Sequence, residues 1–137
     1  MYSIVYVSTG NPTVEDKVIE AIFEDFKAAN EALGICGILM YSEGNFFQIL
    51  EIEYTRKDII IDLFEKIKKD DRHHDIIKIT EHQTVSRAFS KYVCTFITLI
   101  KPGEISDLYK FLRQEKIYNP KGYEGIAYLT QKFLTLI

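Results

Sequence analysis

The chain has 137 residues, of which 47% are hydrophobic and 27% are charged, and it carries a formal net charge of -3 with a pI near 5.6. This length suits one domain with a single substantial core. The acidic balance argues against a broad nucleic-acid surface, and no apolar run approaches the roughly 20 residues of a membrane span. The first residues lack a basic start and a cleavage site, so we expect a cytoplasmic protein with no nucleic-acid or membrane partner.

The N-terminal part of the chain predicts a strand followed by a helix. The run from Tyr2 to Ser8 alternates and is rich in β-forming residues, which is typical of a strand. Apolar residues then recur at helical spacing, with charged residues on the other face. This amphipathic helix is expected to have Thr13 as its N-cap, to run to about Asn30 and to stop before Gly34.

Two apolar runs, 35–41 and 46–51, follow and predict a β-hairpin, because Gly44 in the short connection supplies the positive φ angle that the turn needs. Gln48 is a carboxamide inside the second run, which is otherwise strongly apolar. A buried amide left unpaired costs roughly 1–3 kcal/mol. We therefore expect a hydrogen-bond partner for Gln48 inside the fold.

The later elements complete a recognisable order. A helix is predicted over 57–69, a polar break over 70–75, and strands over Ile76–Glu81 and Tyr92–Ile100. The order βαββαββ, with two amphipathic helices, predicts an α+β ferredoxin-like sandwich: a mixed five-stranded sheet with both helices on one face.

The remaining residues predict a C-terminal two-helix cap. Pro102-Gly103 is expected to end the sheet unit, and short helices are expected at about 105–112 and 125–136. We thus divide the chain into a domain over residues 2–101 and a cap over 102–137. The apolar faces of the cap must pack on the free side of the sheet, on a partner subunit, or on both.

Several other kinds of site lack support in the sequence. His73 and His74 stand in a polar stretch without a third ligand at recognisable spacing, so we interpret them as part of a solvated loop and expect no metal. Cys36 and Cys94 lie in apolar runs and are interpreted as buried small hydrophobes. No phosphate-binding glycine motif occurs anywhere.

What remains is a polar set within apolar elements: Tyr6 on the first strand, Asn30 at the end of the first helix, and Gln48 on the third strand. The first and third strands are usually neighbours in such a sheet, so Tyr6 and Gln48 are predicted to approach one another. One interpretation is a core hydrogen bond plus an Asn at a helix C-terminus, where Asn is common. The other is a cofactor site, because an amide that accepts from a phenol while donating elsewhere suits a ligand with both donors and acceptors. Both interpretations stand at this point.

The order and spacing of these residues resemble the BLUF family of blue-light sensors, which bind a flavin, usually FAD, without a covalent link. The resemblance covers roughly residues 2 to 100, and Asp71-Arg72-His73 looks like the family's D-x-R-H stretch. The positions that carry it are Tyr6-x-Ser8, Asn30 and Gly37-x-Leu39-x-Tyr41-x-x-Gly44-x-Phe46-x-Gln48-x-Leu50-Glu51.

The resemblance implies a flavin ring between the two helices, over the sheet. Asn30 would then hydrogen-bond the carbonyl edge of the ring, and Gln48 would bridge the ring and the Tyr6 hydroxyl. In the family, light drives electron and proton transfer from the Tyr through the Gln, whose side chain rearranges so that the flavin spectrum shifts to the red. Arg72 is expected to contact the phosphates or the ribityl chain, with a purely structural Arg as the alternative. FAD is the expected cofactor, with FMN or riboflavin as other forms.

The resemblance also implies a sensor that is not an enzyme and that signals through protein contacts, in a homo-oligomer and with an unidentified downstream partner. Many members carry a Trp and a Met on the fifth strand, where this chain has Tyr92 and Cys94. These two residues are therefore the expected signal-relay positions. The alternative hypothesis is a ferredoxin-like binding or interaction module without flavin or photochemistry.

Overall fold

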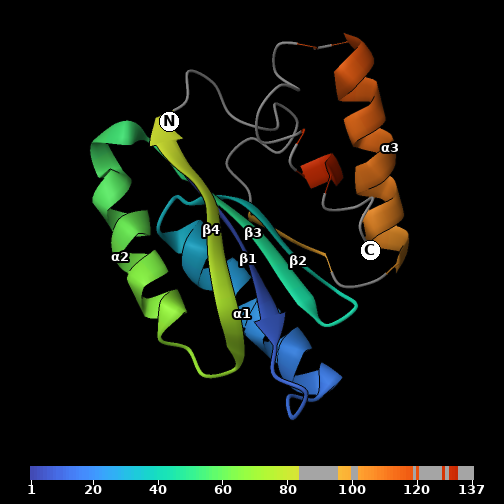
Figure 1. The fold of residues 1–137 in the computed structure, drawn as a ribbon. Coiled ribbons are helices and arrows are strands. Elements are labelled where there is room, and N and C mark those ends of the chain that lie inside the picture. The colour runs from blue at the N-terminus through green and yellow to red at the C-terminus, as the bar shows by residue number, and fades with distance from the viewer. Residues whose placement is uncertain (84–95, 100–101, 119, 121–127, 129, 133–137) are drawn as a thin grey trace.

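A computed structural model describes residues 1–83, 96–99, 102–118, 120, 128 and 130–132 of the chain (Figure 1). Its elements follow the predicted order βαββαββ, and the last helix lies where the first helix of the C-terminal cap was predicted. They are β1 Tyr2–Gly10, α1 Asp16–Ala32, β2 Cys36–Ser42, β3 Asn45–Ile52, a 3-10 turn Tyr54–Arg56, α2 Lys57–Lys68, β4 His73–Gln83, β5 Phe96–Leu99 and α3 Pro102–Tyr118.

The five strands form one mixed sheet in the order β4-β1-β3-β2-β5. Neighbouring strands are antiparallel except β2 and β5, which are parallel. The hairpin between β2 and β3 has a two-residue turn in which Glu43 and Gly44 both have positive φ angles, 53° and 79°. Two such residues fit the right-handed twist of the paired strands. This turn fixes the register of β3, and therefore the place of Gln48 on the sheet.

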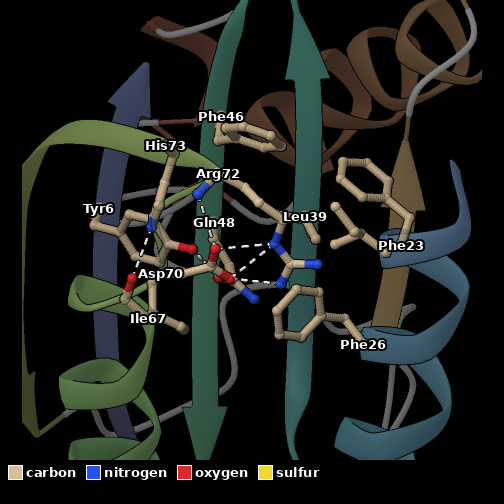
Figure 2. A pocket seen from close by; sticks show the side chains of 11 residues that line it. Tyr6, Phe23, Phe26, Leu39, Phe46, Gln48, Ile67, Asp70, Arg72 and His73 are labelled. Carbon is tan, nitrogen blue, oxygen red and sulfur yellow. Dashed lines mark hydrogen bonds and ion pairs between the residues drawn. The ribbon is translucent and has the colours of Figure 1, made fainter. Parts of the chain in front are cut away.

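Helices α1 and α2 pack on the same face of the sheet, as predicted. One buried cluster joins them to the side chains of alternate residues on β1 and β3, including Ile4, Tyr6 and Leu50. The residues between these, such as Val5 and Ile49, are also fully buried and face the other way. Figures 1 and 2 show α3 on that opposite side of the sheet. The predicted ferredoxin-like α+β class is therefore confirmed.

The start of α1 differs from the prediction. The helix begins at Asp16 after Glu15 rather than at Thr13, and no side chain caps it. The backbone N–H of Val14 instead donates to the carbonyl of Asn11 at 3.0 Å, which closes a turn around Thr13. Thr13, the predicted N-cap, therefore lies within this turn and not at the start of the helix.

The end of α1 also lies beyond the expected place, because the helix continues past Asn30 to Ala32. Gly34 follows with a φ angle of 74°, and the N–H of Ile35 donates back to the carbonyl of Asn30 at 2.9 Å. A glycine in the left-handed conformation is a common way to end a helix. Asn30 consequently lies in the last full turn of α1 and not at its end.

The strand β4 and the helix α3 are both longer than predicted. β4 starts at His73, because His73 and His74 pair with Gly10 and Thr9 of β1. β4 is an edge strand and most of its side chains are exposed. Its first residues are polar and show no alternation of apolar and polar residues, so the sequence pattern did not reveal where the strand starts. α3 begins at Pro102, a residue suited to the first helical position, where the sequence had suggested only a break. Tyr92, Cys94 and most of the last predicted helix lie outside the described residues.

Candidate functional site

The site is built around Tyr6 and Gln48, which lie directly opposite each other on β1 and β3. The hydroxyl of Tyr6 donates a hydrogen bond to Gln48 Oε1. Both side chains are buried, with 3% and 2% of their surface exposed. The predicted approach of these two residues is therefore present in the structure.

Two buried amide nitrogens, one of them in this pair, have no hydrogen-bond partner among the described residues. They are Nε2 of Gln48 and Nδ2 of Asn30, and Asn30 is only 1% exposed. Asn30 lies one helical turn beyond Phe26, so both residues lie on the same face of α1. Each unpaired buried donor costs roughly 1–3 kcal/mol. A ligand with hydrogen-bond acceptors would satisfy both.

A pocket opens beside Gln48, between the sheet and the two helices (Figure 2). Most of the lining is aromatic or aliphatic, which suits a flat ring system. The residues that line it are Tyr6, Ile22, Phe23, Phe26, Leu39, Phe46, Gln48, Ile67, Asp70, Arg72 and His73.

Asp70 and Arg72 bring an ion pair into this pocket. The guanidinium donates from Nε to Asp70 Oδ1 at 2.9 Å and from Nη2 to Oδ2 at 2.5 Å, and the backbone N–H of Arg72 donates to Oδ1 at 3.0 Å. These bonds lower the pKa of the Asp70 carboxyl and raise the pKa of Arg72. In Figure 2 the guanidinium extends over the pocket between Gln48 and Phe26. Arg72 thus meets the pocket with its charge already matched by Asp70.

His73 joins three elements at the edge of the pocket. Its Nδ1 lies 2.7 Å from Ser8 Oγ on β1, and its Nε2 lies 2.7 Å from the carbonyl oxygen of Ile67 on α2. A carbonyl only accepts, so Nε2 carries the proton that binds it. Its ring also makes edge contacts with Tyr6 and Phe46. The interpretation of His73 as part of a solvated loop is therefore wrong.

The phenol of Tyr6 is held in its neutral form. Burial raises its pKa well above the ordinary range, and the negative charge of Asp70 acts in the same direction. A phenol that keeps its proton and donates it to an amide oxygen is a proton and electron donor without net charge. Such a pair is tolerated in an apolar site where an ion would be costly.

The structure brings Tyr6, Gln48 and Arg72 to one pocket. Asn30 is not among the residues that line this pocket and lies on α1, one turn beyond the lining residue Phe26. The structure adds Asp70, which the sequence interpretation missed, since Asp71 had been taken with Arg72 and His73 as the motif. The D-x-R-H spacing in fact starts at Asp70, with Asp71 as the variable position. This spacing is the sequence signal that could have identified Asp70. Among the described residues, no group of three or more His, Cys, Asp or Glu side chains could hold a metal ion.

Comparison with known proteins agrees with this geometry. The model of the BLUF family, described as sensors of blue-light using FAD, matches residues 1–94. The photoactivated adenylate cyclase subunit beta of Euglena longa is 30% identical over 87 residues, which are 64% of this chain and 10% of that protein. The chain thus spans about a tenth of the length of this curated relative.

Solved structures share the fold over most of the chain. The photo-activated state of BlsA is 27% identical, with a TM-score of 0.65 over 97% of this chain and 90% of that one. BlrB, a BLUF protein in its dark state, is 24% identical, with a TM-score of 0.65 over 99% and 96% of the two chains. BlrP1 of Klebsiella pneumoniae, in a calcium/cy-diGMP complex, is 24% identical, with a TM-score of 0.65 over 80% of this chain and 28% of that one.

The fold and the pocket define an α+β domain with a largely apolar pocket between two helices and a sheet. The family model matches more than half of the residues, so the chain belongs to the BLUF family and is a flavin-binding blue-light sensor. The flavin-free interaction module is not favoured, because the Gln48 amide nitrogen, which has no partner among the described residues, lies in a pocket with aromatic walls. In the part of the chain that the structure describes, no helix is long and apolar enough to cross a membrane.

Proposed function

We propose that Tyr6 and Gln48 are the photoactive pair of this sensor. The observation that carries the proposal is the hydrogen bond that the Tyr6 hydroxyl donates to Gln48 Oε1. The nitrogen of the same amide is buried at the pocket and has no partner in the part of the chain that the structure describes. A bound flavin supplies absorption of blue light and an electron-accepting excited state. Tyr6 would be the residue that supplies an electron and a proton to the flavin, and the Gln48 amide would be the residue that carries the proton between them. Because an amide has a donor end and an acceptor end, Gln48 can exchange its hydrogen bonds and hold a new arrangement.

The residues present fit a flavin. Gln48 Nε2 and Asn30 Nδ2 would donate to acceptor atoms at the ring edge, and Phe23, Phe26 and Leu39 would cover its apolar part. Arg72 would lie near the polar side of the ligand, toward the ribityl chain and its phosphates. We propose FAD as the form that is bound, in keeping with the description of the family.

The output of the sensor follows as a set of further proposals. The chain acts in the cytoplasm as a sensor rather than as an enzyme, with a flavin-binding unit over residues 2–101 and a helical cap over 102–137. The cap carries the signal to a homo-oligomer and to a downstream protein partner. Tyr92 and Cys94 relay the change at Gln48 to the sheet. Buried Leu108 and Leu112 of α3 support the cap, because the helix already packs part of its apolar face within the chain.

The test is optical. Purified full-length protein should be yellow, release a flavin on heat denaturation, and show a reversible shift of its flavin spectrum to longer wavelength under blue light. Chromatography of the released flavin against FAD, FMN and riboflavin standards identifies the form. Colourless protein that takes up no added flavin, or a flavin spectrum that light leaves unchanged, would contradict the proposal.

A further inference from the structure

The C-terminal end of α1 is closed by two backbone hydrogen bonds, one of which ends on Asn30. The N–H of Gly34 donates to the carbonyl of Glu31 at 3.1 Å, and the N–H of Ile35 donates to the carbonyl of Asn30 at 2.9 Å. Together with the left-handed conformation of Gly34, these two bonds make a Schellman motif. The backbone of Asn30 is thus an anchor of the motif that ends the helix, and fraying of this motif would displace its side chain.

A side chain from another element completes this helix end. Arg56, in the 3-10 turn between β3 and α2, donates from Nη2 to the carbonyl of Leu33, the C-cap residue, at 2.8 Å. A cation at a helix C-terminus is favourable, because the negative end of the helix dipole lies there. The last turn of α1 has no basic residue of its own and contains the carboxylate of Glu31. Arg56 therefore supplies a charge that the helix itself lacks.

Gly34 leaves the space that the guanidinium of Arg56 occupies. A Cβ atom at this position would lie 2.8 Å from Arg56 Nη1, which is too close for two non-bonded atoms. The glycine thus serves both the backbone conformation of the helix end and the approach of Arg56. The hydrogen bond to Leu33 and the space at Gly34 are two separate signs of a fitted contact between the β3–α2 connection and the end of α1.

We propose that Arg56 is a positioning residue for Asn30: by closing the end of α1 from outside the helix, it keeps the Asn30 amide in place for the ligand. The proposal rests on the proposed function, in which Nδ2 of Asn30 donates to the flavin. That nitrogen is buried and has no partner among the described residues, so the helix backbone sets its direction. Arg56 is exposed and is not among the residues that line the pocket, so its effect on the ligand passes through the helix end.

The central experiment measures the affinity of flavin-free full-length protein for riboflavin, which carries no phosphate that the charge of Arg56 could attract. Dissociation constants are obtained in the dark from quenching of flavin fluorescence. Arg56→Gln should weaken binding roughly two- to fivefold, the range for loss of a cation at a helix C-terminus. Arg56→Lys should restore most of the affinity, because an ammonium group can still donate to the carbonyl of Leu33.

Lys57→Gln is the matched control. It removes an equal charge from the next residue, whose Nζ donates to the Tyr54 hydroxyl and not to α1. The riboflavin constant of Lys57→Gln should equal that of the wild type. Equal losses of affinity in Arg56→Gln and Lys57→Gln would overturn the proposal.

A double-mutant cycle and a spectrum test whether Arg56 acts through Asn30. Asn30→Ala should weaken binding more than Arg56→Gln does, and Arg56→Gln should add no further loss in the Asn30→Ala background. In infrared spectra of bound riboflavin, Arg56→Gln should move a flavin carbonyl band toward its position in Asn30→Ala, which a merely stabilising residue would not do. Additive losses in the double variant, or a carbonyl band that stays in place in Arg56→Gln, would overturn the proposal.

A measurement without flavin separates this proposal from the proposed function. Amide hydrogen exchange followed by NMR should be roughly two- to fivefold faster at Gly34 and Ile35 in Arg56→Gln than in the wild type. The amide of Ile19, near the other end of α1, should exchange at the wild-type rate. Unchanged exchange at Gly34 and Ile35 would refute the role of Arg56 at the helix end, whereas wild-type protein that binds no riboflavin would contradict the proposed function instead.

Discussion

Two tyrosines on β1, Tyr2 and Tyr6, point to the same face of the sheet, yet their surroundings differ. The Tyr2 hydroxyl donates to Glu81 Oε2 at 2.6 Å, near the edge of the sheet, where Lys78 also contacts Glu81. The Tyr6 hydroxyl donates to the amide oxygen of Gln48 in the buried pocket. Both phenols have raised pKa values, but hydrogen bonding to Glu81 is the main cause for Tyr2, and burial for Tyr6.

The comparison shows that the partner, more than the phenol, distinguishes the proposed photoactive site. Hydrogen bonds from Lys78 and Tyr2 lower the pKa of Glu81, so its carboxylate is ionised at neutral pH and can only accept. Gln48 has one end that accepts and one that donates, and its donor end has no partner within the described residues. The Tyr2 arrangement is thus a fixed contact near the edge of the sheet, whereas the proposed exchange of the Gln48 amide would give the Tyr6 arrangement a second state.

The largest effect is expected from removing the second state itself. Gln48→Leu should retain flavin, because the shape of the pocket is kept, but should lose the light-induced red shift completely, because a methyl-ended side chain cannot exchange hydrogen bonds. The measurement is the light-minus-dark absorption difference at equal flavin occupancy. Gln83→Leu, the same change at an exposed position of β4, is the control and should leave the shift intact. An undiminished shift in Gln48→Leu would show that Gln48 is not the switch.

Removing each tyrosine hydroxyl tests the comparison directly. Tyr6→Phe should remain yellow but give no productive red-shifted state, since the proton and electron donor next to Gln48 is gone. Tyr2→Phe removes the same atom from the same strand and should shift like the wild type. Flash absorption of both variants measures the yield and the recovery of the shifted state. If Tyr2→Phe also abolished the shift, the distinction between the two ends of β1 would not hold.

The Tyr6–Gln48 pair was predictable because it depends on local rules. A two-residue turn with Gly44 sets the register of the hairpin, and strand alternation sets the face of the sheet to which Gln48 points. Because β1 and β3 are neighbours, Tyr6 then lies directly opposite Gln48. The helices were predictable for a similar reason, as apolar residues recur along them at helical spacing. The fold class and the contact between Tyr6 and Gln48 therefore follow from short-range patterns combined with one rule of topology.

Asp70 and His73 were not predictable in this way. Both stand in a run of polar residues that reads as a solvated loop, and periodicity says nothing about such a run. Their roles come from tertiary placement: the segment crosses from α2 to the edge strand β4, which brings His73 to Ser8 and the Arg72 side chain over the pocket. The prediction of Thr13 as the N-cap was wrong for a related reason, because a backbone turn from Asn11 to Val14 competes with capping.

A moderate effect is expected on stability in the flavin-free protein. Tyr6→Phe leaves Gln48 Oε1 buried without its donor, which should lower the free energy of unfolding by about 1–3 kcal/mol. Tyr2→Phe leaves Glu81 with Lys78 and access to water, so its cost should stay below about 1 kcal/mol. Urea unfolding followed by circular dichroism gives both values from the midpoints at a common slope. Equal losses in the two variants would mean that the surroundings of the two phenols are energetically alike.

The smallest effect concerns alkaline pH and separates the two tyrosines by titration. Its hydrogen bond to Glu81 raises the pKa of Tyr2 from 10.0 to about 12. Because the folded state holds this proton more tightly than the unfolded chain does, the Tyr2 contribution to stability is complete below pH 10 and is lost between pH 10 and 12. The difference in free energy of unfolding between wild type and Tyr2→Phe should therefore shrink across that window. Urea midpoints measured from pH 8 upward test this, and two curves that stay parallel to pH 12 would show that Glu81 does not hold the Tyr2 proton.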